Sequence, residues 1–390
     1  MIEIETAPFQ TSRRADAIAL GLGAIGTLAF LTGLRMDPGR AWLDLLVAAF
    51  LFLCLALAGL VFLAIQHLAS AGWWCAFRRV PEALMSLIPV AAVPMLAVYL
   101  GRRFLYPWTR PEVAAEPAIA AKSAYLNEPF FLARMLLFLG LWSLFAMLLR
   151  RASLAQDGTP GLAHHRRQVR LSAVFVVTFA VTFSFASYDW LMSLSPRWAS
   201  TMFAVYTFAG LFLEGVAGIT LAVVLLRERG PLAGIVREGH LRDLGKLLFA
   251  FSTFWAYIWV CQYLLIWYGN ILEEIPYYHV RTNGPWLPLF VLTPVLNWGV
   301  PFVLLLPRAA KRNPALLKAV AAVVLLGRWL DLYVIAAPAV LPGPRLGFLE
   351  LLIAAGFAGL FFLAFTRSLA GAPLLARNDP FLAESLRHHA

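Results

Sequence analysis

Six ionisable residues lie inside long apolar stretches of this chain, and their chemistry needs an explanation. They are Arg134, Asp189, Glu214, Arg328, Asp331 and Glu350. On insertion scales, an ionisable side chain at the centre of a lipid bilayer costs about 2.5–3.5 kcal/mol. Each of the six therefore requires a partner of opposite charge, a water-lined cavity or a function that uses the charge.

Glu214 is the strongest candidate for such a function. Gly210 and Gly218 stand four residues on either side of it and form a small-residue face of the kind that packs against another helix. The Glu214 carboxyl should therefore point into the helix bundle. Without a nearby cation, a buried carboxyl can take up and release a proton near neutral pH. The alternative is structural: Glu214 bonds a neighbouring helix or pairs with Arg134.

A second feature is a hydroxyl stripe that ends at Asp189. Thr178, Thr182 and Asp189 follow helical spacing and share one face of the expected helix. We expect a proton path between Asp189 and Glu214 along this stripe. The alternative is that both threonines bond their own helix backbone, as hydroxyl side chains in membrane helices often do.

Arg328 and Asp331 have a simpler interpretation. They are three residues apart on one expected helix, a spacing at which opposite charges meet. The sequence predicts a structural ion pair.

A polar and aromatic cluster is expected at one membrane face, near Asp189. Its further members are Gln262, Asn270, Glu273, Glu274, His279 and Arg281, among many Trp and Tyr residues. A quinone headgroup needs a hydrogen-bond donor and a proton-exchanging side chain within an apolar cleft, and these residue types meet that need. The alternative is an ordinary interfacial aromatic belt whose charged residues are solvated or contact another subunit.

Composition determines the elements that must position these residues. Sixty-one per cent of the 390 residues are hydrophobic and 14 % are charged, which excludes an ordinary soluble domain. The apolar runs of about 20 residues predict an all-α integral membrane protein with about ten transmembrane helices. The expected spans are 17–35, 44–67, 81–100, 129–149, 168–191, 198–226, 244–269, 286–306, 314–337 and 345–366.

The charges between the spans predict the topology. Of the 32 Lys and Arg residues, 21 fall on the side of the N-terminus and 9 on the opposite side, so both termini are expected in the cytoplasm. The domains are then a cytoplasmic segment 1–16, a ten-helix domain 17–366 with a periplasmic cover loop 101–128, and a cytoplasmic tail 367–390. The basic residues form no domain of their own, which argues against a nucleic-acid partner.

Three stretches carry a resemblance to a known family. They are SYDWLMSLSPRWASTMFAVYTFAG at 187–210, LGKLLFAFSTFWAYIWVCQYLLIWYGNILEEIPYY at 244–278 and NDPFLAESL at 378–386. They resemble the ActF family, which comprises NrfD-like membrane subunits of alternative complex III, a respiratory quinol:cytochrome c oxidoreductase related to polysulfide reductase. One departure is NILEE at 270–274, where the family pattern has a Pro in place of Leu272.

The resemblance implies a fold, a location and site residues. The fold would be two four-helix bundles plus extra helices, in the bacterial inner membrane. Asp189 and Glu214 would belong to the proton path, with Tyr257 and Gln262 as further candidates.

The resemblance also implies partners and cofactors. The partners would be an ActC-like sister subunit, an iron–sulfur subunit, haem c subunits, small membrane subunits and membrane lipid, with a terminal oxidase as a further candidate. Haem c and iron–sulfur clusters would sit only in the partners, because the three cysteines of this chain form no CxxC pair and no metal site is evident. A contact with menaquinone or another quinone is the cofactor interaction expected of this chain. The chain would not catalyse the redox reaction without its partner subunits. The alternatives are a secondary transporter and a purely structural scaffold subunit.

Overall fold

The computed structural model describes residues 9–388 and contains ten helical spans that are long and apolar enough to cross a membrane. The chain is thus a multi-pass, all-α membrane protein, as predicted. The first eight residues of the predicted segment 1–16 and the last two of the predicted tail 367–390 lie outside the described residues. Seven uninterrupted spans are α1 (Arg13–Met36), α2 (Pro38–Leu68), α8 (Glu128–Gly158), α9 (Leu162–Trp190), α10 (Phe203–Glu228), α11 (Glu238–Gly269) and α16 (Phe348–Ala370).

Three spans are less regular. The third is divided into α3 (Arg79–Met85), α4 (Ile88–Val98) and α5 (Arg102–Leu105). The eighth is divided into α13 (Leu287–Pro294), a π-helical turn over Val295–Gly299, and α14 (Val300–Leu305). Prolines explain this second interruption, because Pro294 and Pro301 cannot donate the backbone hydrogen bonds of a regular helix. The ninth span, α15 (Pro314–Ala336), continues into a short 3₁₀ turn.

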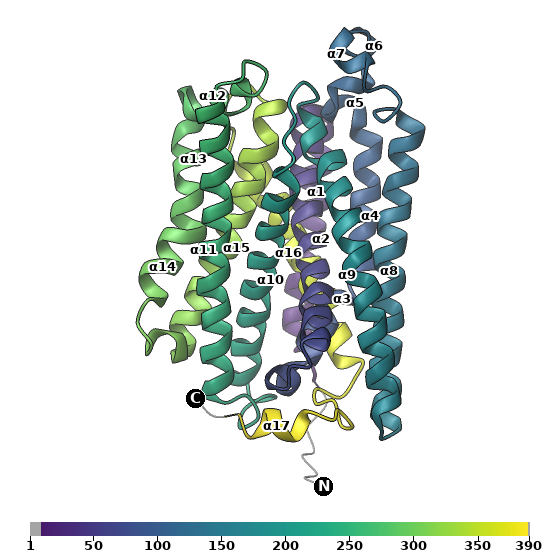
Figure 1. The fold of residues 1–390 in the computed structure, drawn as a ribbon, viewed down its shortest axis with the longest axis vertical. Coiled ribbons are helices and arrows are strands. Elements are labelled where there is room, and N and C mark those ends of the chain that lie inside the picture. The colour runs from purple at the N-terminus through teal and green to yellow at the C-terminus, as the bar shows by residue number, and fades with distance from the viewer. Residues whose placement is uncertain (1–8, 389–390) are drawn as a thin grey trace.

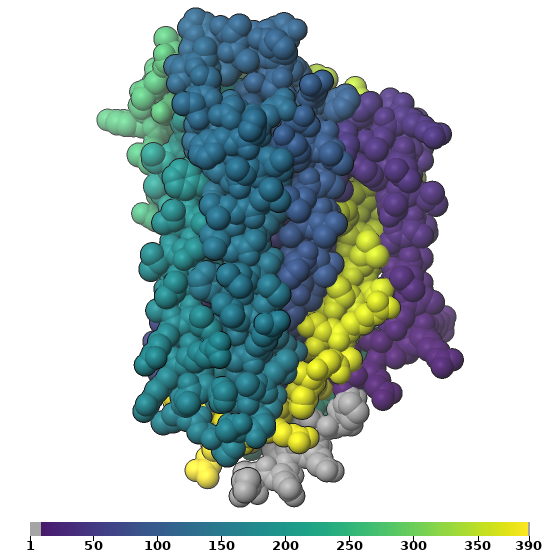
Figure 2. All heavy atoms as spheres, turned by 90° about the vertical axis from the view of Figure 1, so that its right-hand side faces the viewer, coloured from purple at the N-terminus to yellow at the C-terminus, as the bar shows by residue number. Residues whose placement is uncertain are grey.

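The spans pack as two four-helix groups and one additional pair. The first group contains α2, α3 with α4, α8 and α9, and the second contains α10, α11, α13 with α14, and α15. The groups meet where α2 packs against α10, and α2 is buried along most of its length. Helices α1 and α16 form the additional pair at the edge of the molecule, seen in purple and yellow in Figure 2. This arrangement matches the expected two four-helix bundles with extra helices.

Small residues explain the close packing of several helices. A Cβ at Gly26 of α1 would overlap the backbone of Gly356 in α16, and the same holds in reverse. Gly215 of α10 leaves the space that Ala58 of α2 fills. Backbones that approach this closely gain dispersion contacts, which drive helix association where lipid removes the hydrophobic effect.

The two ends of the helix bundle differ. The α12 end, at the top of Figure 1, carries α12 (Ile275–Thr282), α5, α6 (Pro111–Ala114) and α7 (Pro117–Ala120), so the predicted cover segment 101–128 is partly helical. Two hydrogen bonds tie this cover to the end of α9 and to the connection after it. Tyr106 Oη donates to the carbonyl of Trp190, the last residue of α9 (3.1 Å), and Lys122 Nζ donates to the Pro196 carbonyl (2.8 Å).

The opposite end, called the α17 end, is closed by the C-terminal segment with α17 (Leu382–Leu386) (Figure 1). Ser385 accepts a hydrogen bond from the Ala76 amide (2.9 Å) and donates one to the Trp73 carbonyl (2.7 Å). Asp379 accepts a hydrogen bond from Arg78, which is buried. The predicted tail is therefore a docked element of the fold.

Candidate functional site

Glu214 lies near the middle of α10 and is fully buried, with 0 % of its surface exposed. Helix α10 packs against α2 and α15, and Glu214 interacts electrostatically with Cys54, which lies near the midpoint of α2. Neither carboxyl oxygen has a hydrogen-bond partner among residues 9–388. The carboxyl points into the bundle, as Gly210 and Gly218 on either side of it predicted. The surrounding helices leave both of its oxygens without a hydrogen bond.

Arg328 of α15 interacts electrostatically with this carboxyl. Its guanidinium lies over Gly210, where a Cβ would overlap it, one helical turn from Glu214. The predicted ion pair between Arg328 and Asp331 is present, and the Tyr206 hydroxyl donates to the same carboxylate. The sequence did not identify Arg328 as a neighbour of Glu214; Gly210 leaves room for this guanidinium from another helix.

Arg134 of α8 pairs with Asp189 of α9 rather than with Glu214. Arg134 Nε lies 2.7 Å and Nη2 2.9 Å from the two carboxylate oxygens, a bidentate geometry. The guanidinium also lies 3.9 Å from the ring centre of Tyr125 and 4.2 Å from that of Phe130. The expected structural alternative, a Glu214–Arg134 clamp, is wrong, and the clamp that exists joins α8 to α9.

The threonines of the predicted stripe bond their own helix. Thr178 donates to the Val174 carbonyl (2.8 Å) and Thr182 to the Thr178 carbonyl (2.7 Å). The Thr182 hydroxyl also accepts a hydrogen bond from the Trp142 indole (2.9 Å). The two hydroxyls do not bond each other, so this geometry favours the structural interpretation of the stripe. Tyr257 is also outside any internal path, because it is 62 % exposed on α11.

Replacing Thr182 by Val tests the structural role of the stripe. The buried Trp142 indole would lose its acceptor, so we expect the free energy of unfolding to fall by about 1–3 kcal/mol. Thr178→Val is the matched control, since the Thr178 side chain is half-buried, bonds only its own helix and should cost less than about 0.5 kcal/mol. Thermal unfolding of the two variants in detergent measures both changes in stability. Equal stability of the two variants would contradict the assignment.

The six residues of the predicted quinone cluster are divided among three hollows at the α12 end. The largest, about 630 Å³, contains Glu273 and Arg281 in its lining. A second, about 270 Å³, contains Asn270 and His279, and a third, about 410 Å³, contains Gln262 and Glu274. Ile266 lines both the second and the third, so they lie on either side of it. The cluster therefore does not converge on one cleft.

The largest hollow is built on a stacked aromatic pair. The rings of Trp198 and Tyr277 lie 3.7 Å apart with an interplanar angle of 8°. Burial raises the pKa of the Tyr277 hydroxyl above its ordinary value. Arg281 is buried beside the pair and donates to the carbonyls of Val334 (3.0 Å) and Ile335 (2.7 Å). Arg281 thus fastens α12 to the end of α15, and Glu273 supplies an exposed carboxylate at the rim.

Gln262 is the predicted cluster residue with the clearest free bonding capacity. It is 2 % exposed, its side-chain oxygen has no partner among the described residues, and it lines the third hollow with Tyr188 and Glu274. An amide and a carboxyl at one hollow supply a hydrogen-bond donor and a proton-exchanging group. This hollow therefore offers both kinds of group together with a buried acceptor, the Gln262 side-chain oxygen, that is free to accept a hydrogen bond from a quinol hydroxyl.

A scan against protein-family models and a search of curated proteins gave no match.

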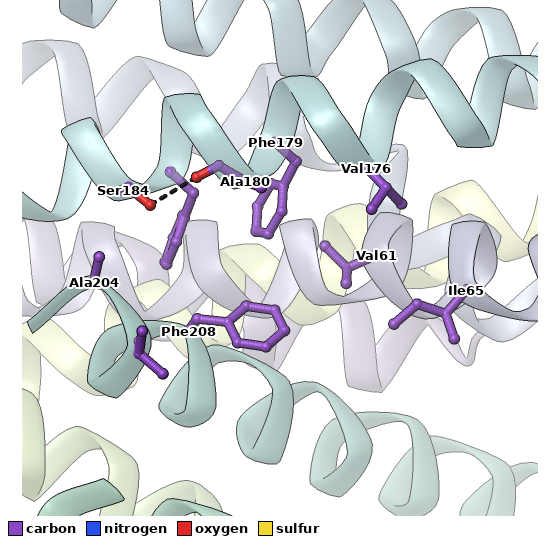
Figure 3. A pocket seen from close by; sticks show the side chains of 10 residues that line it. Val61, Ile65, Val176, Phe179, Ala180, Ser184, Ala204 and Phe208 are labelled. Carbon is purple, nitrogen blue, oxygen red and sulfur yellow. Dashed lines mark hydrogen bonds between the residues drawn. The ribbon is translucent and has the colours of Figure 1, made fainter. Parts of the chain in front are cut away.

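A fourth hollow opens within the membrane-spanning region, between α2, α9 and α10 (Figure 3). Its volume is about 240 Å³ and its lining is apolar, with Phe179 and Phe208 from facing helices. The Ser184 hydroxyl donates to the Ala180 carbonyl (2.7 Å), the dashed line in Figure 3, so it offers no free donor. The hollow can accept a hydrocarbon chain but provides no contact for a polar headgroup.

Several buried polar residues were not predicted from the sequence. Glu82 at the start of α3, Asp44 near the start of α2 and Asn297 in the π-helical turn are all buried. The Asn297 side chain lies where a Cβ at Gly327, next to Arg328, would crowd it. The sequence did contain signals that could have identified them. Asp44 and Glu82 each lie within a few residues of the start of an apolar run, and Asn297 lies between two prolines. Among residues 9–388 no group of three or more His, Cys, Asp or Glu side chains is placed to hold a metal ion.

Proposed function

We propose that this chain is an integral membrane subunit of a respiratory quinol:cytochrome c oxidoreductase of the alternative complex III type, in which it contributes a proton path centred on Glu214. The observation that carries the proton path is the Glu214 carboxyl, fully buried at the middle of the bundle with both oxygens unpartnered among the described residues. The assignment to the complex rests on the sequence blocks at 187–210, 244–278 and 378–386.

The local chemistry supports a carboxyl that changes its protonation state. Without a hydrogen-bond partner, the protonated form is favoured in this apolar setting. When Glu214 releases its proton, the Arg328 guanidinium one turn away stabilises the carboxylate, because Asp331 occupies only part of its bonding capacity and Arg328 Nε is unpartnered among the described residues. Both protonation states are thereby tolerated, which proton transfer requires.

The other residues have supporting roles in this proposal. The 21-to-9 charge bias assigns the α17 end to the cytoplasm and the α12 end to the periplasm. In this proposal haem c and iron–sulfur clusters belong to partner subunits. These partners would contact the α12 end of this chain or the helices of the ActC-like sister subunit. The hollow at Gln262 and Glu274 is the place where a quinone headgroup would touch this chain.

Proton translocation by the reconstituted complex tests the proposal, with wild type compared with Glu214→Gln at matched assembly. We expect quinol oxidation to persist and the ratio of protons moved to electrons transferred to fall to half or less. Glu228→Gln is the control, because this residue ends α10 as a 37 % exposed partner of Lys318. An unchanged ratio in Glu214→Gln would favour the scaffold role. Loss of quinol oxidation alone would instead favour a quinone site.

A further inference from the structure

A second buried carboxyl without a partner lies near the α12 end. Asp44 stands six residues after Pro38, the first residue of α2, and is 4 % exposed. Its Oδ2 atom has no hydrogen-bond partner among residues 9–388. Unlike the exposed acids of the loops, Asp44 keeps only a small exposed surface.

The charged groups around Asp44 are already bonded to one another. Arg40 donates from Nε and Nη2 to the two oxygens of Glu350 (2.5 and 2.8 Å), which also accepts the Gly347 amide (2.8 Å). Asp37 pairs with Arg345 (3.1 Å). Arg40 therefore has its best bonds directed at Glu350 in α16 and not at Asp44.

Four titratable or charged groups face Asp44 in this setting. They are Glu350 of α16, Arg40 of α2, Asp37 at the junction of α1 and α2, and Tyr333 of α15. Two buried carboxyls, Asp44 and Glu350, lie near a single guanidinium, that of Arg40, which bonds Glu350. If both were ionised, the buried group would carry one excess negative charge, so binding one proton makes it neutral. The proton belongs on Asp44, because Glu350 is the acid that Arg40 bonds.

We propose that Asp44 is a proton-exchange site of this chain, passing protons between the path through Glu214 and the aqueous phase at the α12 end. The proposal rests on the proposed function of Glu214. Cys54, which interacts electrostatically with Glu214, lies ten residues further along α2, or about 15 Å along the helix axis. In this role Asp44 replaces Asp189, whose two oxygens are both bonded by Arg134.

Infrared difference spectroscopy of the assembled complex tests the site without turnover. A pH step in light and heavy water should reveal a protonated-carboxyl C=O band that shifts on deuteration. We expect Asp44→Asn to remove this band and Asp44→Glu to retain it at a shifted position. Glu128→Gln, an acid at the same end with 31 % of its side chain exposed, is the control and should leave the band unchanged. Glu214→Gln identifies the band of the other buried carboxyl without a partner among the described residues. If Asp44→Asn removes no band beyond that one, the proposal is overturned.

Proton translocation separates failure of this site from failure of the Glu214 proposal. We expect the proton-to-electron ratio to fall at least twofold in Asp44→Asn and to recover in Asp44→Glu. A normal ratio in Asp44→Asn together with a reduced ratio in Glu214→Gln would overturn the role of Asp44 and leave the path through Glu214 intact. A normal ratio in Glu214→Gln would reject the path itself, whereas the infrared band would still report whether Asp44 binds a proton.

Discussion

Glu82→Gln is expected to prevent this chain from accumulating as a folded membrane protein. Glu82 is fully buried at the α17 end and accepts hydrogen bonds from Arg78 Nε (2.7 Å), Arg79 Nη1 (2.5 Å) and Arg150 Nη1 (2.7 Å). Removing one partner of a buried ion pair costs about 3–5 kcal/mol. Here one acid serves three arginines, so the loss should lie at or above that range.

The charge balance of the cluster explains why the cost is high. Arg78 also bonds Asp379 and Arg79 also bonds Asp157, so three acids neutralise three arginines. Without the Glu82 carboxylate, Arg150 keeps, among residues 9–388, only a weak bond to the Ser368 carbonyl (3.3 Å), and the cluster carries one excess positive charge. An uncompensated charge of this kind is what makes broken buried pairs destabilising.

Membrane expression level and thermal unfolding in detergent measure the effect. Glu128→Gln is the matched control, because its pair with Arg102 is partly exposed and such pairs contribute about 0–1 kcal/mol. Similar yields and unfolding temperatures for Glu82→Gln and Glu128→Gln would refute the structural importance of the cluster. Because Asp379 belongs to the docked tail, we also expect the tail to become protease-sensitive in Glu82→Gln membranes.

The number and order of the spans could be predicted because the bilayer imposes a length on each apolar run. The boundaries were less accurate, and this error affected the site. The predicted second span began at residue 44 and the predicted third at 81, so Asp44 and Glu82 stood in the first turn of their spans and were not among the six ionisable residues considered. Helix α2 begins at Pro38 and α3 at Arg79, which moves both acids inside the folded bundle.

The pairing of buried charges was less accessible to sequence than their presence. Arg328 and Asp331 could be paired because helical geometry fixes neighbours three residues apart. Arg40 and Glu350 are 310 residues apart and meet only because α1, α2 and α16 pack together. No local pattern encodes such a contact. In the same way, the open space at Gly210 was recognised, but the guanidinium that uses it was not.

The quinone cluster shows a related limit. The sequence placed its six residues at one end of the bundle, and the structure agrees. Whether the side chains converge depends on side-chain directions in an irregular segment, which begins at Asn270 in the left-handed backbone region (φ 48°). Arg281, turned towards carbonyls of α15, is therefore a fastening residue, whereas Gln262 keeps free bonding capacity.

Arg134→Met is the second substitution for which we expect a large loss. It leaves the fully buried Asp189 carboxylate without its bidentate partner, at a cost of about 3–5 kcal/mol. Methionine has a similar length and keeps the contacts with the rings of Tyr125 and Phe130. The double variant Arg134→Met/Asp189→Asn removes both charges and should recover at least half of the lost stability, as measured by thermal unfolding of the assembled complex.

The same double variant also decides what Asp189 does. If Asp189 only clamps α9 to α8, the double variant should move protons at nearly the wild-type ratio, since Glu214 and Asp44 are intact. Restored stability with a lost proton-to-electron ratio would instead place Asp189 in the proton path, as the sequence predicted. A double variant no more stable than Arg134→Met would contradict the clamp. Because one carboxyl cannot be fixed by a permanent bidentate partner and also exchange protons freely, these outcomes separate the two roles.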